Sequence, residues 1–194
     1  MTLRSRPTVA VRQSAAPFAA RRVLVYGVTG SGKSTLAAAI AARTGLPWHD
    51  VDELTWAPGW TPVPEAEQRN RFQAICAQDR WVLDTAYTSW NDIPLVRTDL
   101  IVGLDYPRLL SLSRLVRRTA ARVADRRVIC NGNVETLWST LGRESIIAWH
   151  FRSFARKRTA IRRWAADPDG PPVVLLRSPA ATRRWLESLG PVAP

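Results

Sequence analysis

The stretch "VLVYGVTGSGKST" (residues 23–35) begins with an apolar run, bends at a glycine and continues into lysine, serine and threonine. Residues 27–34 fit the pattern G-x-x-x-x-G-K-[ST] in full. The run at 21–27 is short and β-branched, which predicts a buried strand. The alanine-rich segment 33–45 has apolar residues at helical spacing and ends in glycine. The sequence therefore predicts a strand, a phosphate-binding loop and a helix in direct succession.

Each residue type in this loop suits the binding of a nucleoside triphosphate. Glycines let backbone N–H groups turn toward phosphate oxygens, and the following helix presents its positive end to the same anion. Lys33, one of two lysines beside 26 arginines, would contact the β- and γ-phosphates, Ser34 would reach Mg²⁺, and Thr35 would lie near the α-phosphate. An ordinary glycine-rich turn is the alternative. The predicted nucleotide-binding residues here are Gly27, Thr29, Gly30, Ser31, Gly32, Lys33, Ser34 and Thr35.

Five short apolar runs alternate with segments of helical periodicity along the chain. The runs lie at 21–27, 46–50, 80–84, 99–105 and 171–176. Helices are expected near 33–45, 64–78, 107–124, 144–166 and 179–189. The connection at 125–143 is irregular and contains an Asn-Gly-Asn turn. This alternation predicts a three-layer α/β/α fold, in which helices cover both faces of a five-stranded parallel sheet.

Aspartates follow three of the predicted strands, at the sheet edge where ligands of such folds bind. Asp84 follows an apolar Trp-Val-Leu run, as the acid beside a catalytic metal does, so Ser34 and Asp84 are the predicted Mg²⁺ ligands. Asp52 is a candidate to orient an acceptor, take its proton or hold a metal-bound water. Asp105 is expected to cap a helix, and a cap or turn role is the alternative for Asp50, Asp52 and Asp84 as well.

The formal net charge of +12 is unevenly distributed. Residues 1–22 carry +5 and residues 108–163 carry +11, whereas residues 23–107 carry −4 and the last 31 residues balance. A basic excess raises nucleic acid as a partner. Because this excess lies in a tail and one internal segment, it also fits an arginine-bearing lid over a phosphate site.

The expected helix at 107–124 carries four arginines on one face, namely Arg114, Arg117, Arg118 and Arg122. Phosphoryl transfer needs cations on the oxygens of the transferred group, so Arg118 and Arg122, beside the lid, are predicted to act in catalysis. A solvated basic face is the alternative, and it is the expectation for the arginines between 152 and 163. An apolar stripe that includes Leu109 and Val116 is expected to pack.

Residues 1–20 contain Ala, Arg, Pro and Ser without periodicity, and we expect them to form a disordered leader. Their arginine-rich, acid-free composition leaves a transit peptide as the alternative. Cys76 and Cys130 lack metal or redox spacing and are expected to be reduced thiols of a cytoplasmic protein. No apolar run approaches the ~20 residues that a bilayer requires.

Several segments together resemble the adenylate-kinase-like P-loop kinases, in particular the bacterial topology modulation proteins. They are the loop at 27–34, "DVDELTWAPGW" (50–60), "DRWVLDTAY" (79–87), "LIVGLDYPR" (100–108) and "VVLLRSPAATRRWL" (173–186). The resemblance implies one domain at 21–194 with strand order 2-3-1-4-5, an acceptor insert at about 52–78 and a lid at about 118–145. It implies that Arg177, Ser178 and Pro179 line the adenine. Thr85 stands where the group typically has a glycine. Glycine would let an acceptor approach the backbone closely, so this difference affects which acceptor can bind.

These features lead us to expect a kinase that binds ATP and Mg²⁺ and moves the γ-phosphate to a small acceptor, such as a nucleoside monophosphate or an alcohol. Lys33 and the lid arginines would neutralise charge, and Asp52 and Asp84 would handle acceptor and metal. The alternative is a nucleotide-gated nucleic-acid-binding ATPase, which would use the basic segments and tryptophans. A GTPase is less well supported because the chain has no N-K-x-D element. No membrane partner is expected.

Overall fold

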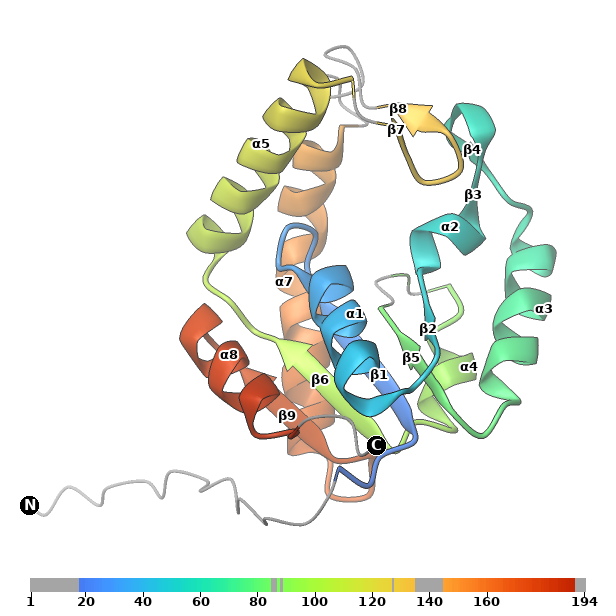
Figure 1. Cartoon of the computed structure of the whole chain (residues 1–194), viewed down its shortest axis with the longest axis vertical. Coiled ribbons are helices and arrows are strands. Elements are labelled where there is room, and N and C mark those ends of the chain that lie inside the picture. Colours follow the sequence, from blue (N-terminus) through green and yellow to red (C-terminus); the bar gives the residue numbers. More distant parts are fainter. Residues whose placement is uncertain (1–17, 85–86, 88, 127, 135–144, 191–194) are drawn as a thin grey trace, which may run out of the picture.

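The centre of the protein is a five-stranded parallel sheet of order β2-β5-β1-β6-β9 (Figure 1). The computed structural model describes residues 18–84, 87, 89–126, 128–134 and 145–190. The strands of this sheet are β1 (Arg22–Gly27), β2 (Trp48–His49), β5 (Trp81–Leu83), β6 (Leu100–Leu104) and β9 (Val173–Leu176). Counted alone along the chain, these five strands have the order 2-3-1-4-5. The predicted three-layer α/β/α fold class is confirmed.

Helices cover both faces of the sheet (Figure 1). One face packs on α1 (Lys33–Thr44) and α8 (Pro179–Glu187). The other packs on α3 (Glu65–Cys76), α4 (Asp92–Leu95) and α7 (Ile146–Ala166). The remaining helices are α2 (Val51–Thr55), α5 (Arg108–Ala124) and the short 3-10 helix η1 (Pro58–Trp60). Within the described residues, no helix is long and apolar enough to cross a membrane.

The alternation of side chains along β1 divides the core into two layers. Val23 and Val25 pack toward α1 and α8, whereas Leu24 and Tyr26 pack toward the opposite helices. All four are fully buried, as expected of the central strand of a sheet that is covered on both faces. Two aromatic residues of the second layer, Phe72 and Trp90, stack with their ring centroids 3.6 Å apart.

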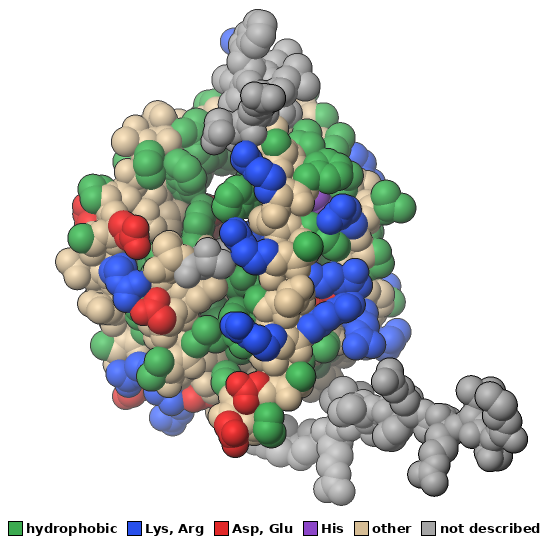
Figure 2. Space-filling model, turned by 180° about the vertical axis from the view of Figure 1, so that it is seen from behind, with side chains coloured by type: hydrophobic (Ala, Val, Ile, Leu, Met, Phe, Trp, Pro, Cys, Tyr) green, Lys and Arg blue, Asp and Glu red, His purple; other side chains and the backbone are tan. Residues whose placement is uncertain are grey.

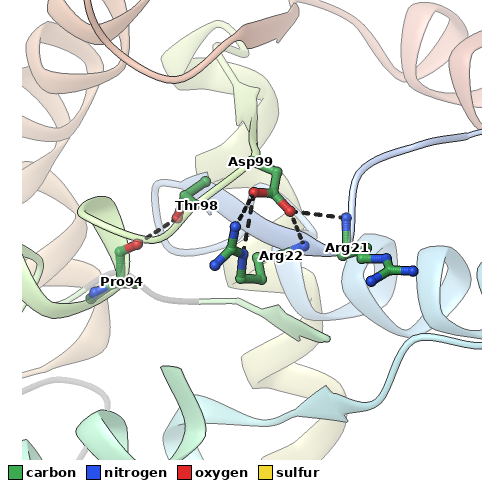
Figure 3. A network of polar contacts seen from close by, with 5 residues as sticks. All are labelled: Arg21, Arg22, Pro94, Thr98 and Asp99. Atoms are coloured by element: carbon green, nitrogen blue, oxygen red, sulfur yellow. Dashed lines mark hydrogen bonds and ion pairs between the residues drawn. The ribbon is translucent and has the colours of Figure 1, made fainter. Parts of the chain in front are cut away.

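A carboxylate joins the beginnings of β1 and β6 (Figure 3). Asp99 accepts hydrogen bonds from the backbone N–H groups of Arg21 and Arg22 and from the guanidinium of Arg22, at 2.7 Å for Nη2. The two strands then run in parallel register until Gly27 lies opposite Leu104. The ends of β1 and β6 therefore meet at the same edge of the sheet, where the phosphate loop begins.

Two short hairpins lie outside the central sheet. β3 (Trp56–Ala57) pairs with β4 (Thr61–Pro62), and β7 (Val128–Ile129) pairs with β8 (Asn133–Val134). The second hairpin corrects the expectation that the whole connection at 125–143 is irregular. Strands of two residues are too short for a periodic pattern, and their pairing depends on contacts that the sequence does not display.

Residues directly before 21 pack on the central domain. Phe18 packs on Trp185 of α8 with ring centroids 6.5 Å apart, so this end of the expected leader belongs to the folded domain. The rest of the expected leader, 1–17, lies outside the described residues.

The buried face of α5 also differs from the expectation. Leu109 and Val116 are 80% and 44% exposed, whereas Ser111, Leu115 and Thr119 are buried. Gly30 of the phosphate loop lies directly against Ser111 and Leu115, so contact with the loop decides which face of α5 is buried.

Candidate active site

The loop between β1 and α1 turns back on itself as a phosphate cradle requires. The N–H of Ser31 donates to the carbonyl of Val28 at 3.1 Å. Gly32 caps α1 with φ 90°, a left-handed conformation that other residues rarely adopt. The helix therefore begins at Lys33, and its N-terminus faces the space that the loop encloses.

Helix α5 lies directly against this loop at Gly30. A Cβ atom on Gly30 would lie 2.3 Å from the carbonyl oxygen of Ser111 and 2.9 Å from Cβ of Leu115, so only glycine fits. Arg114 lies on the same part of α5, and its Nη1 donates to the carbonyl of Ser31 at 3.4 Å. Arg114, one of the four α5 arginines that share a face, therefore contacts the loop directly.

A buried histidine supports the loop from α7. His150 is fully buried, and its Nδ1 donates to the carbonyl of Thr29 at 3.0 Å. Burial lowers the pKa of His150, and the charges of Arg108 and Lys157 lower it further. The ring is therefore neutral at neutral pH, with the proton on Nδ1 and a lone pair on Nε2 that meets no partner within the described residues.

Asp84 lies buried at the end of β5 beside the start of α1. Its Oδ1 accepts a hydrogen bond from the N–H of Val51 at 3.1 Å. Burial raises the pKa of Asp84, whereas the charge of Lys33 and the side chain of Ser34 act to lower it. The structure thus brings together Lys33, Ser34 and Asp84, the predicted phosphate and metal residues.

Two further aspartates lie beside Asp84 at the start of helix α2. Asp50 caps the helix by accepting from the N–H of Asp52 at 2.9 Å. Asp52 accepts a hydrogen bond from the Tyr87 hydroxyl at 3.3 Å, and that hydroxyl accepts one from Nε1 of Trp56 at 2.8 Å. The carboxylate of Asp52 is therefore held in place by an aromatic pair, as suits a group that orients an acceptor.

We expect Asp50→Asn to stabilise the ligand-free protein at neutral pH. Burial, followed by the charges of Asp84 and Asp52, raises the pKa of Asp50 from 3.8 to about 6. The folded state therefore holds this proton more tightly than the unfolded state, and stability falls as the pH rises from about 4 to 6. Asparagine keeps the helix cap without the charge. After allowance for solvent screening, the gain at pH 7 is about 1 kcal/mol.

Urea unfolding without Mg²⁺ at pH 4 and pH 7 tests this expectation. Asp169→Asn, at an exposed aspartate of the turn before β9, is the matched control and should change stability at neither pH. A gain for Asp50→Asn of equal size at both pH values would contradict the electrostatic explanation.

The β7–β8 hairpin is fastened to the β3–β4 region (Figure 1). Asn133 accepts from the N–H of Trp60 at 2.7 Å and donates to the carbonyl of Ala57 at 3.1 Å. Asn131 donates to the carbonyl of Trp56 at 2.7 Å. The predicted lid and the predicted acceptor insert are therefore joined by side-chain amides, on the side of the site across from α5.

We expect Asn133→Ala to release this hairpin. Asn133 is 3% exposed, and its loss leaves half-buried backbone groups of the insert without partners. Hydrogen exchange of the amides at 128–134 should become about 10-fold faster or more. Asn70→Ala, at an exposed position of α3, is the control and should leave this exchange unchanged. Equal protection in both variants would show that the Asn133 amide does not hold the hairpin.

The other predicted lid arginines lie farther along α5. Arg118 is exposed and Arg122 is half-buried. The charge of Arg122 acts on Cys130, whose Sγ donates to the carbonyl of Asp52 at 3.1 Å. This places Arg122 near the junction of the hairpin and α2, while its role in catalysis stays a prediction, as does that of Arg118.

The predicted adenine residues lie where β9 passes into α8. The Ser178 hydroxyl accepts from the N–H of Ala181 and caps α8, and Pro179 is its first residue. Both residues thus have a structural role of their own. Contact of Arg177, Ser178 and Pro179 with adenine stays a prediction. Thr85, the departure from the resembled group, lies outside the described residues.

Asp105 is an ion-pair centre rather than a helix cap, which corrects the expectation. Its side chain is 1% exposed, and its oxygens lie 2.6 Å from Nε of Arg158 and 3.0 Å from Nη2 of Arg162. Nε of Arg177 lies 4.0 Å away. Arg158 and Arg162 are therefore not part of a merely solvated face, because they fix α7 to the end of β6.

Two residues of the site and a buried lysine of α7 went unnoticed in the sequence. His150 contacts the loop, Tyr87 orients Asp52, and Lys157 is a lysine buried in α7. Lys157 carried a usable signal, because it is the second of only two lysines in the chain. The other two carried none, since a lone histidine or tyrosine has no motif around it.

Comparison with known proteins supports the fold. No family model matches the sequence. The Bacillus subtilis (strain 168) protein named "Uncharacterized protein YqaC" is 26% identical over 153 residues, which cover 78% of this chain and 85% of that protein. The structure of shikimate kinase from Bacteroides thetaiotaomicron has a TM-score of 0.54 at 16% identity and covers 88% of this chain and 97% of that chain. The Acinetobacter baumannii shikimate kinase in complex with shikimate has a TM-score of 0.53 at 17% identity, with coverage of 88% and 91%. The chain therefore has the fold of these kinases.

Proposed function

We propose that this protein is an ATP-dependent kinase that transfers the γ-phosphate to a small-molecule acceptor. One observation carries the proposal: Lys33, Ser34 and the buried carboxylate of Asp84 meet where β1 and β5 end, beside a loop with the backbone of a phosphate cradle. The resemblance of its segments leads us to include the topology modulation group in the proposal. Both cysteines are free, which suits action in the reducing cytoplasm.

The residues at this loop fit a triphosphate and a divalent cation. Ser31 is 1% exposed, and its hydroxyl meets no partner within the described residues. A phosphate oxygen at the loop would satisfy it. Asp84 and Ser34 supply the oxygen ligands that Mg²⁺ prefers, and the cation would offset the cost of burying the Asp84 charge. When bound, Mg²⁺ would neutralise phosphate charge.

The proposed reaction breaks the bond between the γ-phosphorus and the bridging oxygen of ATP, so that ADP leaves, and forms a bond from an acceptor oxygen to that phosphorus. Lys33 holds the phosphates, and Arg114, Arg118 and Arg122 are the candidate cations of α5. With an alcohol acceptor, the hydroxyl proton passes to Asp52, which Tyr87 orients. With a phosphate acceptor no base is needed.

The test is the transfer of labelled phosphate from ATP with Mg²⁺ to a small molecule. The proposal expects label in one class of acceptor. Label that stays in ATP, or appears only as inorganic phosphate, would contradict it.

A nucleotide-gated nucleic-acid-binding ATPase is the second candidate. Figure 2 shows arginines gathered on the face formed by α7, where Arg152, Arg156 and Arg163 are exposed. Fluorescence anisotropy with single-stranded DNA at two salt concentrations, with and without ATP, separates the candidates. Tight binding that falls steeply with salt and changes with ATP would favour this reading. The kinase proposal expects neither.

A further inference from the structure

Lys157 is buried in α7, and its charged end lies toward the N-terminal part of that helix. The residue is 1% exposed, on the same helix face as His150. Its Nζ lies 5.7 Å from the ring centroid of Trp149, two turns back along the helix. Helical side chains lean toward the N-terminus in this way. The ammonium therefore lies toward the end of α7 at which His150 holds the carbonyl of Thr29.

Within the part of the chain that the structure describes, no hydrogen bond or ion pair reaches Lys157. Burial, followed by the charges of Lys33 and Arg156, lowers its pKa to about 7, against the opposing effect of Asp52. His150, the titratable neighbour on the same helix face, is neutral. More positive than negative charge thus surrounds a buried cation, which costs stability unless an anion joins it.

The charges that act on Lys157 also indicate where the missing anion lies. Lys33 is the residue of the loop that meets the β- and γ-phosphates, and Asp52 is the candidate acceptor-side group. A buried group whose charge both of them influence lies near the loop and near Asp52, where a transferred phosphate would have to lie. The chain has 26 arginines, yet a lysine stands at both of these positions, where a compact charge fits a phosphate oxygen.

We propose that Lys157 is a second phosphate-binding lysine, whose ammonium contacts the terminal phosphate of the triphosphate held at the loop. This inference rests on the proposed function and adds a residue from α7 to the phosphate site. It has a direct consequence for ligand choice. A group that contacts only the γ-phosphate favours ATP over ADP. Lys33, by contrast, would contact the β-phosphate as well, which both nucleotides have.

Lys157→Met tests the proposal, because methionine fills similar space without charge. Calorimetric titration with ATP·Mg²⁺ and with ADP·Mg²⁺ should show a loss of about 10-fold or more for ATP and less than about 2-fold for ADP. The unfolding temperature of the ligand-free variant should rise, since an unpaired buried charge is removed. Arg156→Met removes the same charge from an adjacent, exposed position and should preserve the ATP-to-ADP preference.

The outcomes are separable from those of the proposed function. Unchanged ATP affinity in Lys157→Met, or equal losses for ATP and ADP with a lower unfolding temperature, would overturn the role of Lys157 while ATP binding by the parent stands. Titration with inorganic tripolyphosphate tests the role of Lys157 in the case that the proposed function fails. If the parent binds tripolyphosphate but not ATP, the proposed function fails, and a 10-fold loss in the variant still supports Lys157. If the parent binds neither, both proposals fail.

Discussion

Replacing Lys33 with methionine is expected to lower the rate of phosphate transfer from ATP by about 1,000-fold. Lys33 begins α1 directly after the left-handed Gly32, so its ammonium and the helix N-terminus act on the same anion. Methionine keeps the length and helix propensity of the side chain and removes only the charge. The charge that develops on the β- and γ-phosphate oxygens during transfer then loses its nearest fixed cation.

The measurement is ADP release in the presence of an acceptor, combined with thermal unfolding to show that the variant is folded. Arg43→Met is the matched control, because it removes a positive charge from the last turn of the same helix, away from the loop. It should change the rate by less than about 2-fold, as a screened surface charge does. If the Lys33→Met enzyme kept a tenth or more of the parent rate, the loop would have no essential part in phosphate transfer.

Replacing Asp105 with asparagine is expected to lower the free energy of unfolding by about 2–3 kcal/mol. The Asp105 side chain is 1% exposed, whereas those of Arg158 and Arg162 are 36% and 51% exposed. Both arginines lose their partner, and a buried amide must take the place of a carboxylate. Because the arginines can still reach water, we expect a loss at or below the lower end of the range of about 3–5 kcal/mol that is usual for a broken buried pair.

Urea unfolding at pH 7 measures this loss. Asp92→Asn is the matched control, since Asp92 pairs with Arg69 at 2.7 Å but is 61% exposed. That exposed pair should contribute less than about 1 kcal/mol. If both variants lost the same free energy, the connection between β6 and α7 through Asp105 would not be a main source of stability.

The central layers of the fold could be predicted because local patterns determine them. The run at 22–27 is buried on both faces of the sheet, and the glycine-lysine-serine sequence after it permits one backbone path into α1. Asp84 could be placed beside Ser34 for the same reason, since neighbouring parallel strands end at one edge. For these elements a residue pattern is enough, and no distant contact is needed.

The remaining parts of the site depend on contacts between segments far apart in the sequence. Asp105 precedes α5 and therefore looks like a cap, but α7, more than 50 residues later, supplies its partners. Because Gly30 packs against Ser111 and Leu115, that face of α5 is buried. The apolar stripe that begins at Leu109 is not the buried face. The hydrogen bond between Asn133 and the backbone of Trp60 exists only because the hairpin lies on the insert. Such pairings have no periodicity that a sequence can display.

The most direct test of the account is the fate of the γ-phosphate in a single turnover, with enzyme in excess over labelled ATP·Mg²⁺. Separate pools of nucleoside monophosphates, polyols and carboxylated polyols serve as acceptors, and Lys33→Met serves as the inactive control. We expect label in an organic phosphate of one pool and none there with Lys33→Met. Label that remains in ATP or passes only to water in every pool would contradict the claim that this protein is a small-molecule kinase.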